Sequence, residues 1–463
     1  MHSTRAIRAI LFLAILVGVA GVVEGFAVDR RGSVYRVSTQ FSAPRKWDVR
    51  VGGTTLWRYN TVGGALVATT KSKNNKLLLL RRPMASSESG DGATATTTTT
   101  TTLEQQTNRA IEGLMAQHDP ILLFASRLLP SDKATDASAL YAWCRRLDEI
   151  CDNEDNAGGN QKPVRDQLDI WQSRFEALWT TTAQDDDDDE EEESSYPEDD
   201  YLMDLALRDC IEKYQGNDSS SSSNDNDTSL LTRIPFDDMI EGMKSDAVEG
   251  RRIRDMEELE LYAYRVAGTV GLMLLPLLLS DKNGTNDKSS RESTSMLLAI
   301  EKAREPAICL GKAIQLVNIL RDATQDAKLG RIYLPQDMLR EEGVDDECIL
   351  EVALNLNPSL STPSSLILAT PRGYKNVVKK VSRRALELLD SAENGKDTLP
   401  TPLGPLFVQI IVELYRDYLE ELKSRDYDNL CSNVGEDRVK ISTLRKVKAS
   451  LRAITKVGRE FIL

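Results

Sequence analysis

Residues 313–337 read AIQLVNILRDATQDAKLGRIYLPQD, and the pattern of this stretch decides the fold class. Asp322 and Asp326 are four residues apart, so on a helix their carboxylates lie on one face about one turn apart. Gln315 and Asn318 fall on the same side, within an arc of about 80°. The other positions around them are mostly apolar. We therefore predict a largely buried helix whose polar stripe faces an internal cavity.

Buried carboxylates need a counter-charge, and this stretch indicates which one. A hard magnesium ion binds carboxylate, amide and water oxygens and keeps positions open for phosphate oxygens. Arg321 and Arg331 carry planar guanidinium groups, which form charge-assisted hydrogen bonds to phosphate. The stretch therefore predicts a magnesium site that receives a phosphorylated substrate.

A second stretch, YAWCRRLDEICD at residues 141–152, repeats the spacing. Asp148 and Asp152 are four residues apart, and Arg145 lies on the same helical face. Taken alone, such a run is most often a solvated face with an ordinary ion pair. Because residues 313–337 carry a second such pair, a functional role is favoured over that alternative.

Apolar residues at three- and four-residue spacing indicate helices through the rest of the chain. These stretches are 111–129, 137–152, 166–180, 256–279, 295–326, 374–393 and 406–425. Pro130 and Pro335 mark helix boundaries. No glycine-rich strand-to-helix turn of the dinucleotide-binding type occurs, so we predict an all-α protein with one large helical domain over residues 106–463.

Low-complexity tracts interrupt that domain near residues 184–196, 217–229 and 281–290. They contain too little apolar surface to offset the entropy lost on ordering, so we predict surface insertions. Much of the net charge of -14 lies in the first tract, and this negative balance argues against a nucleic-acid partner.

The N-terminus resembles a targeting sequence. Arg5 and Arg8 precede an apolar run at 9–23, which predicts a signal peptide over residues 1–25. Residues 26–105 begin with Phe26 and are at first rich in Arg, Ser and Thr, as in a transit segment that continues into a disordered linker. The arrangement resembles the two-part plastid presequence of algae with secondary plastids. Simple secretion is the alternative, but the six scattered cysteines, which we expect to be reduced thiols, do not favour it.

Four blocks together resemble, in order, the signatures of phytoene synthases and of their squalene synthase relatives, the head-to-head prenyl synthases. The blocks are YAWCRRLDEICD (141–152), PFDDMIEGMKSD (235–246), LYAYRVAGTVG (261–271) and QLVNILRDATQDAKLGRIYLPQD (315–337). The resemblance, which runs from about Asn108 to the C-terminus, implies an isoprenoid-synthase fold, a single helical bundle around an apolar cavity. It also implies that two geranylgeranyl diphosphates condense to phytoene through a cyclopropyl diphosphate. The expected cofactor is magnesium, with manganese as an alternative metal, and no NADPH is expected.

The resemblance also assigns roles to individual residues. The expected metal-binding residues are Asp148, Glu149, Asp152, Asp322 and Asp326. The expected catalytic residues are Tyr141, Arg145, Tyr262, Gln315 and Asn318. The expected substrate-binding residues are Arg145, Arg321, Arg331, Val266, Gly268, Gly271 and Tyr427. For the tyrosines, packing in the core is an equal alternative, because any helix core also uses aromatic rings.

Two departures from the family pattern leave rival functions open. The family's His-Ser-Lys-Ser-Phe-like run is replaced by His118-Asp119-Pro120-Ile121-Leu122, and an Arg-Trp pair by Leu403-Gly404-Pro405-Leu406. A non-catalytic or assembly-factor relative with the same fold is therefore one alternative. A squalene-synthase-like enzyme acting on farnesyl diphosphate is another, although the terminal SLRAITKVGREFIL lacks an apolar run of about 20 residues. The sequence predicts a plastid location and allows peripheral membrane contact, but it leaves prenyl chain length and oligomeric state open.

Overall fold

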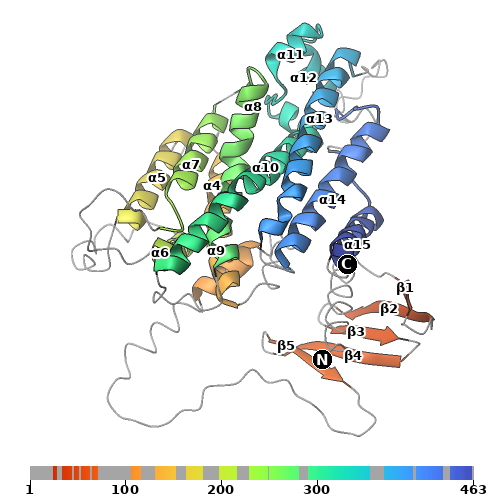
Figure 1. Cartoon of the computed structure of the whole chain (residues 1–463). Coiled ribbons are helices and arrows are strands. Elements are labelled where there is room, and N and C mark those ends of the chain that lie inside the picture. The colour runs from red at the N-terminus through yellow and green to blue at the C-terminus, as the bar shows by residue number, and fades with distance from the viewer. Residues whose placement is uncertain are drawn as a thin grey trace. The chain divides into compact units, whose positions relative to one another are not determined.

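The structure is a computed structural model of the whole chain (Figure 1). It describes residues 24–28, 34–43, 46–51, 54–62, 65–70, 106–115, 131–152, 163–180, 198–215, 229–248, 250–280, 290–354, 370–399, 403–430 and 438–460. The predicted insertions, apart from their end residues 229 and 290, lie outside these ranges, as does the run from His118 to Leu122. The signal peptide does so too, apart from residues 24 and 25.

The chain divides into two compact units, of which one is helical and contains the candidate site. Residues 106–115 are helical and are followed by α4 (Ser131–Asp152), α5 (Val164–Thr180), α6 (Glu198–Gln215), α7 (Ile234–Asp246), α8 (Met256–Ala263), the π-helical turn η3 (Tyr264–Gly268), α9 (Thr269–Leu279), α10 (Ser290–Lys328), α11 (Gln336–Glu341), α12 (Asp346–Leu354), α13 (Arg372–Asn394), the 3₁₀ turn η4 (Lys396–Thr398) and α14 (Leu403–Ser424). A last helix, α15 (Thr443–Glu460), is divided between the two units after Leu451. The all-α prediction is confirmed for this helical unit.

Helix α10 is the central element of the helical unit. It is 39 residues long and packs against α8, α9, α12, α13 and α14 (Figure 1). The apolar positions of its second half are buried as predicted, with Leu316, Val317 and Leu320 almost fully inaccessible. They belong to an apolar cluster formed mainly with α8, α13 and α14. The polar stripe of α10 is therefore carried on a helix that the core holds rigidly.

A second apolar cluster lies between α4, α5, α6 and α7. Its centre is aromatic, with the Trp143 ring 5.4 Å from Phe175 and 5.1 Å from Phe236. Trp143 belongs to α4 and is 2% exposed. The helix that carries the first aspartate pair is thus anchored by its opposite, apolar face.

Helix α10 approaches η3 closely at Gly311. A Cβ atom added at Gly311 would lie 2.6 Å from the Cα of Gly268, a distance that real Cβ atoms essentially never show. We therefore expect Gly311→Ala to lower the free energy of unfolding by about 3 kcal/mol, because one backbone must move away from the other. Denaturant unfolding monitored by circular dichroism measures this change.

Gly113 provides the matched control for that substitution. It lies in the helix at 106–115, and a Cβ there would meet nothing within 4 Å. Gly113→Ala should stabilise the protein by up to about 1 kcal/mol, since alanine favours helix. Equal effects at the two glycines would show that close packing at Gly311 is not important.

One helical stretch among the described residues, Met256–Leu279, is long and apolar enough to span a membrane by length and composition alone. Half of the most apolar 18 residues in this stretch are buried in the protein. The stretch packs against α4, α7 and α10, as a core helix does. The structure divides it into α8, η3 and α9, whereas a single helix was predicted.

The N-terminal segment forms an antiparallel sheet that the sequence analysis did not predict. Its strands are β1 (Glu24–Val28), β2 (Val34–Ala43), β3 (Lys46–Val51), β4 (Thr54–Val62) and β5 (Ala65–Thr70), in the order β1-β2-β3-β4-β5. β-Branched residues in β2 and the Gly-Gly pairs at 52–53 and 63–64 are the overlooked sequence signals. The assignment of residues 26–105 to a transit segment and linker stays a prediction.

Candidate functional site

The first aspartate motif lies in the last three turns of α4. Arg145 donates from Nη1 to Asp148 at 2.7 Å and from Nε to Glu149 at 3.3 Å. The predicted sharing of one helical face by Arg145 and Asp148 is therefore confirmed. Asp148 has 43% of its side chain exposed, so its carboxylate is accessible to other cations. Asp152 ends α4, and its side chain is not among those described.

A hydrogen bond between Arg146 and Asp200 of α6 connects this motif to the neighbouring helix. Arg146 donates to Glu149 at 2.6 Å and to the buried carboxylate of Asp200 at 2.8 Å. Asp200 also accepts a hydrogen bond from Arg174 of α5. Sequence reasoning missed Asp200, because α6 lies between two low-complexity tracts and was not predicted as a helix.

The second aspartate motif lies near the C-terminal end of α10. Arg321 donates to both carboxylate oxygens of Asp322, at 2.9 and 2.5 Å, and its guanidinium lies 5.8 Å from the Tyr418 ring centre. Burial opposes the charge of Arg321, but the hydrogen bonds and charge of Asp322 raise its pKa above the ordinary value. In both motifs an arginine thus supplies the positive charge that the carboxylates require.

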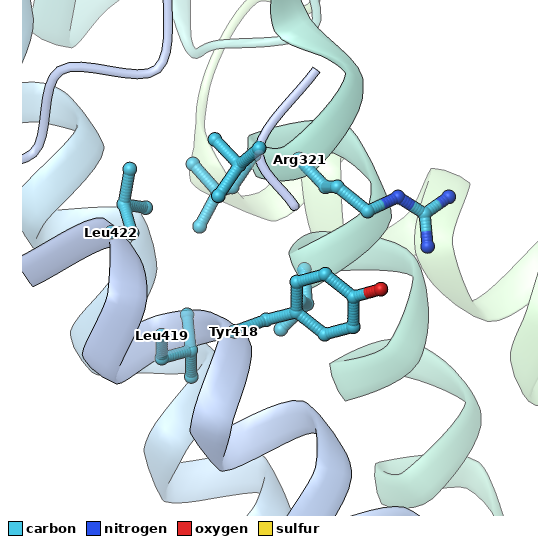
Figure 2. Close-up of a pocket in the computed structure, with 7 residues that line it drawn as sticks. Arg321, Tyr418, Leu419 and Leu422 are labelled. Atoms are coloured by element: carbon cyan, nitrogen blue, oxygen red, sulfur yellow. The ribbon is translucent and has the colours of Figure 1, made fainter. Parts of the chain in front are cut away.

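Arg321 also borders a small apolar cavity. Leu419 and Leu422 line it together with Val317, Leu320, Tyr418 and Val439. Figure 2 shows the guanidinium of Arg321 and the hydroxyl of Tyr418 pointing the same way, away from Leu419 and Leu422. With a volume of about 10 Å³, the cavity is no larger than one water molecule requires and cannot hold a prenyl chain.

The polar stripe of α10 contains an amide oxygen without a partner. Gln315 and Asn318 are both partly buried, and Asn318 Oδ1 accepts no hydrogen bond from any described residue. A buried acceptor that is left unsatisfied costs free energy unless a ligand uses it. This oxygen is therefore suited to a cation or to a donor on a substrate.

Arg331 brings the ends of the two aspartate helices together. Its guanidinium donates to the carbonyl of Cys151 in α4 at 3.4 Å, and its own N–H donates to the carbonyl of Asp326 at 2.8 Å. Gly330, with φ of +74°, makes the tight turn that directs Arg331 back toward α4. Arg331 therefore links the last turn of α4 to the last turn of α10.

A buried tyrosine pair lies close to the second motif. The rings of Tyr262 and Tyr333 stack at 5.3 Å with an interplanar angle of 17°. Burial raises the pKa of both phenols, and the negative charges of Asp246 and Asp326 raise it further. Tyr262 was predicted as a site residue. Tyr333 and Asp246 were missed, although both lie in the quoted blocks.

The other two predicted tyrosines pack elsewhere in the described structure. Tyr141 is partly buried against a small cluster that includes Ile111 and Met203. Tyr427 lies after α14 with φ of +58°, and the ammonium of Lys379 is 5.7 Å from its ring centre. These contacts favour the packing alternative for both residues; the catalytic role of Tyr141 and the substrate-binding role of Tyr427 stay predictions.

The small residues of the VAGTVG segment serve packing between helices. A Cβ at Gly271 would lie 2.8 Å from the carbonyl oxygen of Ala307 in α10, and Gly268 also lies close to Ile308. Val266 packs on both apolar clusters. These glycines therefore allow α10 to approach closely, whereas contact of these residues with a substrate stays a prediction.

The oxygen-bearing side chains of the two motifs are of the type that binds a hard divalent cation. Asp148, Glu149, Asp322 and Asn318 all offer oxygen atoms. Among the described side chains, which exclude that of Asp152, no group of three or more acidic, histidine or cysteine residues is already arranged to hold a metal. The carboxylates of Asp148, Glu149 and Asp322 are all bound to arginines instead.

Comparison with known proteins identifies relatives over most of the helical unit. Residues 115–445 match the model of the family described as squalene/phytoene synthase. Phytoene synthase 1, chloroplastic, from Zea mays is 32% identical over 304 residues, which cover 65% of this chain and 58% of that protein. Phytoene synthase 2, chloroplastic, from Solanum lycopersicum is 30% identical over 316 residues, covering 68% of this chain and 80% of the relative.

A solved structure shows the same fold. A dehydrosqualene synthase crystallised in complex with a ligand aligns with a TM-score of 0.53 and 22% sequence identity. The alignment covers 77% of this chain and 99% of that one.

Proposed function

Since the chain belongs to the squalene/phytoene synthase family, we propose that it is a phytoene synthase that joins two geranylgeranyl diphosphates head to head. The relatives from Zea mays and Solanum lycopersicum are named chloroplastic phytoene synthases, and this supports the choice of substrate and product. Together with the predicted presequence, their names also support a plastid location.

The observation that carries the proposal is the meeting of the two aspartate motifs at Arg331. Arg331 contacts the carbonyl of Cys151, next to Asp152, and the carbonyl of Asp326. Phosphate oxygens bound there would lie beside the guanidinium of Arg331, and the two helices that meet there also carry the acidic groups and the guanidinium groups of Arg145 and Arg321. This combination suits a diphosphate with its metal ions.

We assign the metal ligands to Asp148, Asp152, Asp322 and Asp326, with Asn318 as a further oxygen donor and Glu149 in support. Bound magnesium would withdraw electron density from the leaving diphosphate and thereby ease its departure. The arginines that now hold Asp148 and Asp322 would be released to bind phosphate when the metal takes their place.

The remaining chemistry depends on orientation and on the exclusion of water. The first diphosphate leaves with its bonding electron pair, and the double bond of the second substrate attacks the allylic cation. Loss of a proton then gives the cyclopropyl diphosphate. The ring of Tyr262, held next to the second motif, offers its electron-rich face to such a cation. No step consumes a reductant, so NADPH is not required.

Incubation of the purified full chain with geranylgeranyl diphosphate and magnesium tests the proposal. Phytoene should be extracted and two pyrophosphates released for each phytoene formed. Parallel incubations with farnesyl diphosphate and NADPH test a squalene-synthase-like reaction. If neither substrate releases pyrophosphate, the chain is a non-catalytic relative and the proposal is wrong.

A further inference from the structure

Three buried side chains from separate segments form a continuous chain of contacts beside the second aspartate motif. Asp246 is the last residue of α7, Tyr262 lies in α8, and Tyr333 follows α10. Their exposed fractions are 8%, 5% and 6%. The hydroxyl of Tyr333 donates to Asp246 Oδ1 at 2.5 Å, and the Tyr333 ring stacks on Tyr262 at 5.3 Å.

Each contact fixes a different degree of freedom. The hydrogen bond to Asp246 fixes the position of the Tyr333 hydroxyl and so the direction in which the ring's long axis points. The stack, with only 17° between the planes, then fixes the plane of the Tyr262 ring. The orientation of the Tyr262 ring therefore depends on the hydroxyl oxygen of Tyr333, which is bound to Asp246.

Folding alone does not account for this arrangement. A buried carboxylate loses hydration, and replacing such polar groups by apolar residues of similar volume is often neutral or stabilising. A phenylalanine at position 333 would fill nearly the same space as the tyrosine. Apolar packing alone therefore gives no reason for the tyrosine hydroxyl and the carboxylate at these positions.

The three residues lie where the two aspartate motifs meet. The negative charge of Asp326 contributes to the raised pKa of both phenols. Tyr333 is two residues from Arg331, whose guanidinium reaches the end of α4. Any displacement of this segment would move the Tyr262 ring and the diphosphate region together.

We propose that Tyr333 and Asp246 are positioning residues that hold the ring face of Tyr262 toward the allylic cation. This inference rests on the proposed function and extends it to two residues without an assigned role. An ordered ring face favours attack by the second double bond, which ends in loss of a proton and cyclopropane formation. When the ring is poorly oriented, water adds to the cation instead, and the loss of a proton leaves a prenyl alcohol.

The test is the partition of products in Tyr333→Phe, measured in the full chain with geranylgeranyl diphosphate and magnesium. The substitution removes one oxygen atom and keeps the ring. We expect the ratio of prenyl alcohol to phytoene to rise about tenfold, which corresponds to the loss of roughly one hydrogen bond in the oriented state. The KM should change little, because Tyr333 is not a ligand of the diphosphate.

Tyr264→Phe is the matched control. Its hydroxyl donates to Asp238 at 2.6 Å, so the variant also removes one tyrosine–aspartate hydrogen bond, but from a partly exposed residue of η3. The ratio of alcohol to phytoene should stay at the wild-type value. An equal rise in both variants would overturn the inference, because it would indicate general loosening of the fold.

A double variant separates positioning from stability. Tyr333→Phe combined with Asp246→Leu removes both members of the Tyr333–Asp246 hydrogen bond, so its unfolding midpoint should lie nearer that of the wild type than the midpoint of Tyr333→Phe does. Its ratio of alcohol to phytoene should nevertheless stay raised. The inference is wrong if either the single or the double variant shows the wild-type ratio. If the wild type itself releases no pyrophosphate, the proposed function has failed, which the wild-type measurement alone reveals.

Discussion

Asp322→Asn should lower turnover by about three orders of magnitude, because it removes several kcal/mol of transition-state stabilisation. The substitution takes away one negative charge and nearly preserves side-chain volume. Arg321, which now donates to both oxygens of Asp322, would retain only one good acceptor. Asp148→Asn should act in the same way, since Asp148 has the matching position in the first motif.

Steady-state kinetics at saturating magnesium measure this effect, and thermal unfolding shows whether the variant is folded. Asp169→Asn in α5 is the control, because Asp169 is also a helical carboxylate bound to a cation, with Lys244 at 2.6 Å. It should keep wild-type turnover. Near-normal activity of Asp322→Asn or Asp148→Asn would exclude a metal site built from the two motifs.

Trp143→Ala should lower the free energy of unfolding by about 3–5 kcal/mol, the usual cost of removing a large buried aromatic side chain. The loss has two parts, the apolar area that Trp143 buries and the cavity that its ring leaves. The neighbouring rings of Trp171, Phe175 and Phe236 come from α5 and α7, so they cannot close the gap without moving those helices.

Denaturant unfolding of the purified variant measures this loss. Ile170→Ala in α5 is the control, since Ile170 is 37% exposed and its truncation should cost under about 1 kcal/mol. A loss below about 1 kcal/mol for Trp143→Ala would mean that the aromatic cluster does not anchor α4.

Periodicity predicted the helices that matter most for the site. The second half of α10 could be read from its sequence because apolar spacing, a polar stripe and Pro335 all agree. Helix α6 was missed because acidic and serine-rich tracts flank it and hide its apolar positions. The N-terminal sheet was missed because its composition was interpreted as that of a targeting segment, although β-branched residues and Gly-Gly pairs were present.

Only those features of the candidate site that follow from local helix geometry were predicted. Helical geometry places Arg145 beside Asp148 and indicates the stripe that contains Asn318. It cannot indicate that Tyr333 reaches Asp246, because these residues are 87 positions apart in the chain and meet only through packing. Tertiary contacts of this kind have no local periodicity to reveal them.

The π-helical turn η3 determines which residues of the stretch 256–279 face α10. Tyr262 and Gly271 are nine positions apart, so an uninterrupted α-helix would place them on opposite sides, about 180° apart. The extra residue of a π-turn reduces this angle to about 80°. In the structure Tyr262 belongs to the apolar cluster around α10, and Gly271 lies against Ala307 of α10. Deleting Ala267, which is not among the expected site residues, would therefore rotate Tyr262 away from α10 while every side chain of the site remained in the sequence.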